Sequence, residues 1–82
     1  MTINENWAVS TARIEAFFNE QAGIMFCDGV YKFGDCTITL TPDTGSIGAI
    51  TVGRTQVCFE GPEEQVRVIY KRFFLRFLSA GG

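Results

Sequence analysis

The sequence contains no histidine, the residue that most often serves as a general base, as the partner of a catalytic serine or cysteine, and as a metal ligand. Its three cysteines, Cys27, Cys36 and Cys58, form no CxxC pair. A zinc site would therefore need an unusual set of three thiolates and a carboxylate. These absences argue against catalysis, and we expect no cofactor and no bound metal.

Long apolar segments are also missing. The opening residues, MTINENWAVS, lack a basic stretch followed by an apolar core, so we expect no secretory signal. The longest apolar run is far shorter than the roughly 20 residues that span a bilayer. An odd number of cysteines fits a complete disulfide framework poorly. We expect a cytoplasmic protein whose thiols are buried as small hydrophobic groups, with no redox pair between Cys27 and Cys36.

An excess of positive charge is absent as well. Seven basic residues face nine acidic ones, and the net charge is −2. Proteins that bind nucleic acids normally carry a basic surplus that replaces the counterions condensed on phosphates. An acidic chain is also repelled by anionic lipids. We therefore expect neither a nucleic acid nor a membrane as partner.

Apolar side chains, in contrast, are plentiful. They make up 46% of the 82 residues, and eight of the aromatic residues are phenylalanine. A chain of this length forms one domain, residues 1–82, and a domain of this size hides only about 60% of the surface of the unfolded chain. The composition is globular, and it is rich enough to suggest that some apolar surface is buried between chains.

Apolar residues at helical spacing predict a helix at each end of the chain. In the first, Trp7 to Ala22, the apolar side chains fall on one face, and Gly23 is suited to end the helix. Gly61-Pro62-Glu63-Glu64 predicts the start of the second, because proline favours the first turn and acidic residues oppose the helix dipole. Glu63 also precedes Arg67 by four residues, the spacing of a helical ion pair.

Between these helices the apolar residues recur at every second position. One face is predicted to hold Tyr31, Phe33, Cys36, Ile38 and Leu40. Gly34-Asp35 is the predicted two-residue turn in this hairpin, and Gly29 a bulge or kink. We expect a loop over residues 41–46 and a second hairpin that turns at Gly53-Arg54. In it, Val52 would pair with Thr55, Ile50 with Val57, and Gly48 with Phe59.

The predicted fold is α+β, in two layers, with the element order α-β-β-β-β-α. Four strands form an antiparallel meander, and the N- and C-terminal helices pack on one face of it.

The last helix has more apolar surface than packing on a sheet requires. On a helical wheel its apolar side chains span about 180°, whereas a packed helix needs a stripe of about 100°. Two more apolar residues lie on the outward side. We predict that the side chains outside the core stripe bind a partner, together with neighbouring basic groups: Val68, Tyr70, Lys71, Arg72, Phe74, Leu75 and Leu78.

Three explanations of this surplus stay open. Tyr70 or Phe74 can seal the edge of the sheet within one domain. Two copies can pack their last helices about a two-fold axis, or another protein can bind there. The basic residues of the helix flank the apolar arc in two pairs, which fits the rim of a buried face better than a phosphate-binding stripe.

The sequence ends in Gly81-Gly82. In this feature it resembles ubiquitin-like modifiers and the sulfur carriers of cofactor synthesis, whose chains also end in a diglycine and are near this length. The resemblance implies a carrier protein. The β-grasp fold of those families opens with a hairpin and reaches its tail from a strand, whereas the order predicted here has a helix at both places. The other interpretation is a helix C-cap followed by a frayed end.

We therefore predict a non-enzymatic accessory or inhibitory module that binds a protein partner, or itself as a homodimer, through the last helix. One alternative is a small-ligand-binding or catalytic domain with a pocket between the helices and the sheet. A carboxylate or thiol with a shifted pKa in a deep cleft would favour it. The other alternative is the diglycine-tailed carrier.

Overall fold

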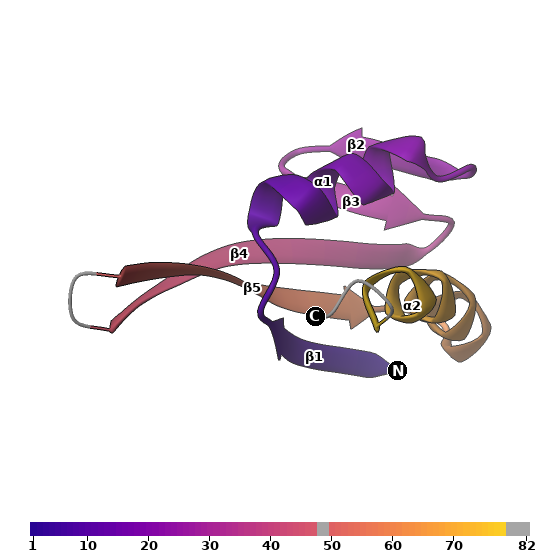
Figure 1. The fold of residues 1–82 in the computed structure, drawn as a ribbon. Helices are drawn as coiled ribbons and strands as arrows, with labels where there is room; N and C mark the ends of the chain where they lie inside the picture. Colours follow the sequence, from indigo (N-terminus) through magenta and orange to yellow (C-terminus); the bar gives the residue numbers. More distant parts are fainter. Residues whose placement is uncertain (48–49, 79–82) are drawn as a thin grey trace.

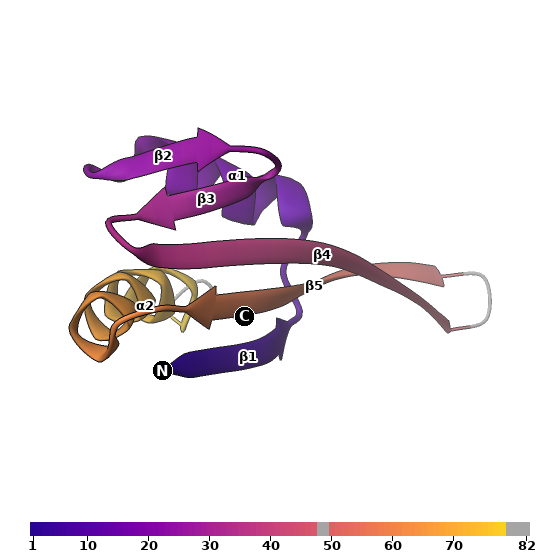
Figure 2. The same ribbon diagram turned by 180° about the vertical axis from the view of Figure 1, so that it is seen from behind.

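In the part of the chain that the structure describes, five strands form one antiparallel sheet, and two helices cover one of its faces (Figure 1). The computed structural model of the protein describes residues 1–47 and 50–78, with side chains described for 1–43 and 53–78. The opposite face of the sheet is open in the view from behind (Figure 2). The strand order is β1-β5-β4-β3-β2. The elements are β1 (Thr2–Trp7), α1 (Thr11–Glu20), β2 (Ile24–Cys27), β3 (Val30–Phe33), β4 (Cys36–Ile47), β5 (Ile50–Glu60) and α2 (Glu63–Leu78).

The prediction of four strands with a helix first is wrong, because the chain opens with strand β1. This strand pairs with β5 in antiparallel register, with Ile3 opposite Phe59 and Trp7 opposite Thr55. Burial alternates along β1, as expected for an edge strand with one covered face. Trp7 was predicted as the start of the first helix, but it belongs to β1. Tertiary pairing with β5 therefore decides the conformation of this segment.

Helix α1 begins at Thr11, four residues later than predicted. Ser10, which precedes it, has the extended backbone of an N-cap residue. The buried Thr55 hydroxyl donates to the Val9 carbonyl oxygen at 2.8 Å and contacts the Thr11 hydroxyl at 2.8 Å. These bonds satisfy a buried polar group and hold the crossing from β1 to α1 against β5.

The predicted bulge at Gly29 is wrong, because Asp28-Gly29 forms a two-residue turn. Asp28 has a φ of 52° and Gly29 a φ of 81°, the pair of positive values that a type I′ turn requires. Cys27 lies opposite Val30, so β2 and β3 are separate strands of four residues each. Strands this short are stable here because they extend a larger sheet.

The predicted Gly34-Asp35 turn and core face are confirmed. Phe33 lies opposite Cys36 across this turn. The side chains of Tyr31, Cys36 and Ile38 are buried, and those of Phe33 and Leu40 pack against the core with part of their surface exposed.

The predicted loop at residues 41–46 and the turn at Gly53-Arg54 are both wrong, because β4 and β5 pair continuously through this region. Val52 lies opposite Gly45, and Ile50 opposite Ile47. The predicted pairs of Val52 with Thr55 and of Ile50 with Val57 are therefore absent from this register. The predicted partner of Phe59, Gly48, lies outside the described residues, and Phe59 pairs with Ile38.

Pro42 lies within β4 because its position needs no hydrogen-bond donor toward β5. Gly61 and Met1 exchange two backbone hydrogen bonds, so alternate pairs along β1 and β5 are hydrogen-bonded from that point. The residues of β5 between those pairs direct their backbone groups to β4 instead. In the β4–β5 register this places the backbone N–H and C=O of Thr41 toward β5, and the backbone of Pro42 away from it. β3 pairs with β4 only as far as Ile38. Pro42 therefore occupies an edge position, where proline is tolerated in a sheet.

The core lies between the helices and the covered face of the sheet, and aromatic rings dominate it. Phe73 of α2 is at its centre, with no exposed surface. Its ring lies 5.0 Å from that of Trp7, 5.5 Å from that of Phe59 and 5.8 Å from that of Phe18, between centroids. One ring thus connects β1, β5 and α1.

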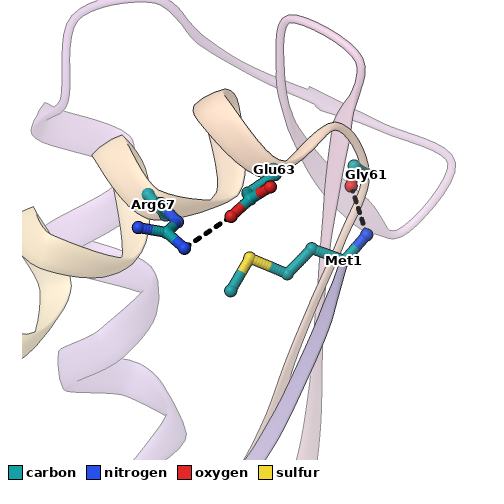
Figure 3. Close-up of polar contacts among 4 residues, drawn as sticks. All are labelled: Met1, Gly61, Glu63 and Arg67. Atoms are coloured by element: carbon teal, nitrogen blue, oxygen red, sulfur yellow. Dashed lines mark hydrogen bonds and ion pairs between the residues drawn. The ribbon is translucent and has the colours of Figure 1, made fainter.

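The start of α2 is tied to the start of the chain. The Met1 amino group donates to the Gly61 carbonyl oxygen at 2.9 Å, and the Gly61 N–H donates back to the Met1 carbonyl oxygen at 3.1 Å. The predicted ion pair between Glu63 and Arg67 is present in the first turns of the helix (Figure 3). α2 therefore leaves the sheet from a fixed point.

Candidate docking surface on the last helix

Helix α2 buries one narrow stripe and exposes apolar side chains beyond it. The buried stripe consists of Val66, Ile69, Phe73 and Phe77. Val68, Leu75 and Leu78 keep 46%, 57% and 56% of their side chains exposed. Exposed apolar groups gathered on one element mark interaction surfaces more often than isolated ones do. The surplus apolar surface predicted for the last helix is thus only partly covered by the domain.

A shallow hollow of about 590 Å³ lies where α2 passes β1. We call it the α2–β1 groove. Its apolar floor is aromatic, because the Phe74 ring lies 6.0 Å from that of Trp7 and 5.9 Å from that of Tyr70. The groove is lined by Glu5, Asn6, Trp7, Ala8, Arg54, Tyr70, Phe74 and Leu78.

The partly buried carboxylate of Glu5 links α2 to β1 in the groove. The Tyr70 hydroxyl donates to Oε1 of Glu5 at 2.8 Å, and Nε1 of Trp7 donates to the same oxygen at 3.2 Å. Burial, with the hydrogen bond to Glu5 and the nearby negative charge, raises the pKa of Tyr70 to about 12. The phenol therefore stays protonated and keeps donating at physiological pH.

Six of the seven side chains predicted to bind a partner lie on one continuous arc. Tyr70, Phe74 and Leu78 line the groove. At about 100° per residue, Lys71, Leu75 and Val68 continue this arc round the helix, and all three are exposed.

Arg72 is the next position round the helix after Val68, but its side chain contacts the domain. Its guanidinium carbon lies 5.3 Å from the centroid of the Phe33 ring, and Nη1 donates to the Ala22 carbonyl oxygen at 3.3 Å. It therefore belongs to the side of the helix that faces β3 and the end of α1.

The prediction missed the contribution of β1 and β5 to this surface. Glu5 and Trp7 of β1 and Arg54 of β5 also line the groove. The available signal was the alternation of Ile3, Glu5 and Trp7 in TINENW, which is typical of a strand. Two asparagines and a glutamate in so short a run obscured it.

The described part of the chain offers no assembled chemistry. Within residues 1–47 and 50–78, no three acidic or cysteine side chains come together as metal ligands. The three cysteines are free thiols, but the prediction that they are buried is wrong for two of them, because Cys27 is exposed and Cys58 is half-buried. Burial raises the pKa of Cys36, but this thiol lies in the core and not in a cleft. No helix among the described residues is long and apolar enough to cross a membrane.

The sequence matches the family described as archaeal MoaD-like protein over residues 5–82, nearly its whole length. The chain therefore belongs to this family. No curated protein and no solved structure matches it. The family is one of small carrier proteins that are not themselves catalytic, so the protein is not an enzyme, as predicted.

Proposed function

We propose that this protein is a sulfur carrier. It holds the sulfur at Gly82 and docks on protein partners through the α2–β1 groove. The observation that carries this proposal is the position of the groove. Leu78, the last residue of α2, lines it, and the family match includes the diglycine that follows. Gly81-Gly82 itself lies outside the described residues.

The length of the tail couples docking to delivery. Four residues separate Leu78 from the end of the sequence. A chain extends by at most about 3.6 Å per residue, so Gly82 stays within about 14 Å of Leu78. A protein that covers the groove is therefore also the protein whose active site the diglycine can reach. We propose that one partner surface supplies both contacts.

The reacting groups must come from that partner. The simplest form in which a glycine carboxylate carries sulfur is a thiocarboxylate, in which one oxygen is replaced by sulfur. A phosphoryl or nucleotidyl group from a nucleoside triphosphate must first be transferred to one carboxylate oxygen. Sulfur at the oxidation level of sulfide must then attack the carbonyl carbon, and the C–O bond breaks as that oxygen leaves with the transferred group. The carrier has no histidine to assist either step. We propose that the partner activates the carboxylate and supplies the sulfur.

The groove suits an extended segment of the partner. β1 is an edge strand, and hydrogen-bonded pairs with β5 alternate along it from Met1 and Gly61. The backbone groups of Thr2, Asn4 and Asn6, in the pairs between, therefore point outward from the sheet. A strand added there would form main-chain hydrogen bonds and direct every second side chain toward the aromatic floor. The exposed Leu78, which lines the groove, would then be buried in the contact, where binding energy concentrates.

Mass spectrometry of the protein isolated from its native cells tests the cargo. We expect part of the population to show the mass change of one oxygen replaced by sulfur, located at Gly82 by fragmentation. A variant that lacks Gly82 is the control and should show no such form. Only unmodified protein in every preparation, or a native chain that continues beyond Gly82, would contradict the proposal.

The free thiols fit the cytoplasmic location that we also propose.

A further inference from the structure

We propose that the β2 edge of the sheet pairs with the β2 edge of a second copy, which joins two five-stranded sheets across a two-fold axis. This contact lies at the opposite edge from β1 and leaves the α2–β1 groove free. It is a second interaction surface, independent of the proposed carrier function.

The side chains of β2 are those of an unprotected edge. The strand reads IMFC, without a charge or a proline. Met25 and Phe26 are 71% and 60% exposed, the largest fractions among the exposed large apolar side chains of the described residues. Natural sheet edges usually carry charged residues or proline that oppose pairing with another chain. β2 therefore has the properties of a strand that pairs.

The backbone of β2 also presents outward N–H and C=O groups at every second residue. Cys27 and Val30 flank a two-residue turn and form a hydrogen-bonded pair, so the backbone of Cys27 and Met25 points toward β3. The N–H and C=O groups of Ile24 and Phe26 then point away from the sheet. These two residues are spaced for an antiparallel partner.

A copy of β2 fits this pattern in one register. Antiparallel pairing centred on Met25 places Ile24 of each copy opposite Phe26 of the other, so that the outward backbone groups bond to each other. Ile24 and Phe26 lie on the helix side of the sheet, since they pair with Phe33 and Tyr31. Met25 of one copy faces Met25 of the other on the open side. Every cross-strand pair is then apolar, which stabilises the ladder.

The charges at the two ends of β2 favour a second copy over an unrelated strand. Asp28 follows the strand at one end. Arg72 marks the other end, because its guanidinium donates to the carbonyl oxygen of Ala22. Antiparallel pairing brings the acidic end of each copy to the basic end of the other, twice by symmetry. In β1, the register centred on Glu5 would bring two Glu5 carboxylates together.

A charge-swap experiment tests the register. We expect sedimentation equilibrium to show that the wild type dimerises at concentrations up to about 1 mM, as a small interface requires. Met25→Lys and Met25→Glu should each weaken dimerisation about tenfold or more, because like charges then face each other. An equimolar mixture of the two variants should restore it. Met25 is exposed, so neither change should disturb the fold.

Leu75→Glu on α2 is the matched control and should leave dimerisation unchanged. A wild type that stays monomeric over this range would overturn the proposal. So would a dimer that both Met25 variants leave intact, or one that Leu75→Glu abolishes, which would place self-association on α2.

Discussion

The most informative single residues lie in the groove, where a carboxylate is held by two donors. Glu5 is on the covered face of an edge strand and accepts hydrogen bonds from Tyr70 and Trp7. Such an arrangement satisfies a partly buried charge and orients both aromatic rings. The groove is therefore shaped by hydrogen bonds as well as by packing, and a partner would meet preformed walls.

The ionisation of Tyr70 tests this arrangement. Its pKa of about 12 lies above the ordinary value of 10.0, so between these pH values the unfolded chain has released a proton that the folded chain retains. The contribution of Tyr70 to stability is complete below pH 10 and is lost as the pH rises toward 12. Absorbance titration of phenolate should show this high pKa in the wild type and its loss in Tyr70→Phe.

Glu5→Gln is the control for the same titration. It should lower the pKa of Tyr70 only in part, because burial is the largest cause of the shift and remains. A Tyr70 that titrates at the ordinary tyrosine value in the wild type would contradict the hydrogen-bonded arrangement.

At the scale of elements, the junction between β5 and α2 determines where α2 lies. A Cβ atom on Gly61 would lie 2.7 Å from Cα of Cys36 and 2.8 Å from the Asp35 carbonyl oxygen. Both are backbone atoms of the β3–β4 turn, so neither can move cheaply. The Oε1 atom of Gln65 accepts from the Asp35 N–H at 2.7 Å and fastens α2 to the same turn. The helix is thus held closely at its first turn.

Gly61→Ala should therefore destabilise the protein by about 1 to 3 kcal/mol, the usual cost of forcing extra atoms into a packed site. Urea unfolding measures the change. Gly53→Ala is the matched control, because a Cβ there meets only Ser10 at ordinary contact distances, and its effect should stay within about 0.5 kcal/mol. Equal stability of the two variants would show that the junction is looser than described.

The elements also show what the sequence could predict. α2, its core stripe and the hairpin at Gly34-Asp35 follow from local signals, since helical spacing, an acidic first turn and a glycine turn all agree. The β4–β5 hairpin does not, because Pro42 and Gly45 normally indicate a loop. Here Pro42 lies beyond the end of β3, in an edge position.

At the scale of the whole molecule, the two edges of the sheet differ in character. β1 is polar and borders the α2–β1 groove, whereas β2 is uncharged and carries the exposed Met25 and Phe26. The exposed apolar arc of α2 was predictable, because an apolar arc wider than a core stripe is visible in the sequence. The β1 half was not, because its position depends on pairing with β5, more than 45 residues away in the chain.

We propose that the α2–β1 groove serves the loading of the diglycine. The most direct test is the fraction of protein that carries sulfur at Gly82 in native cells expressing Leu78→Glu, compared with the wild type. We expect this fraction to fall about tenfold or more, because docking would have to bury the charge of the new glutamate. Ala12→Glu, at an exposed position of α1, should load as the wild type does. If Leu78→Glu folds normally and also loads fully, the groove is not the docking surface.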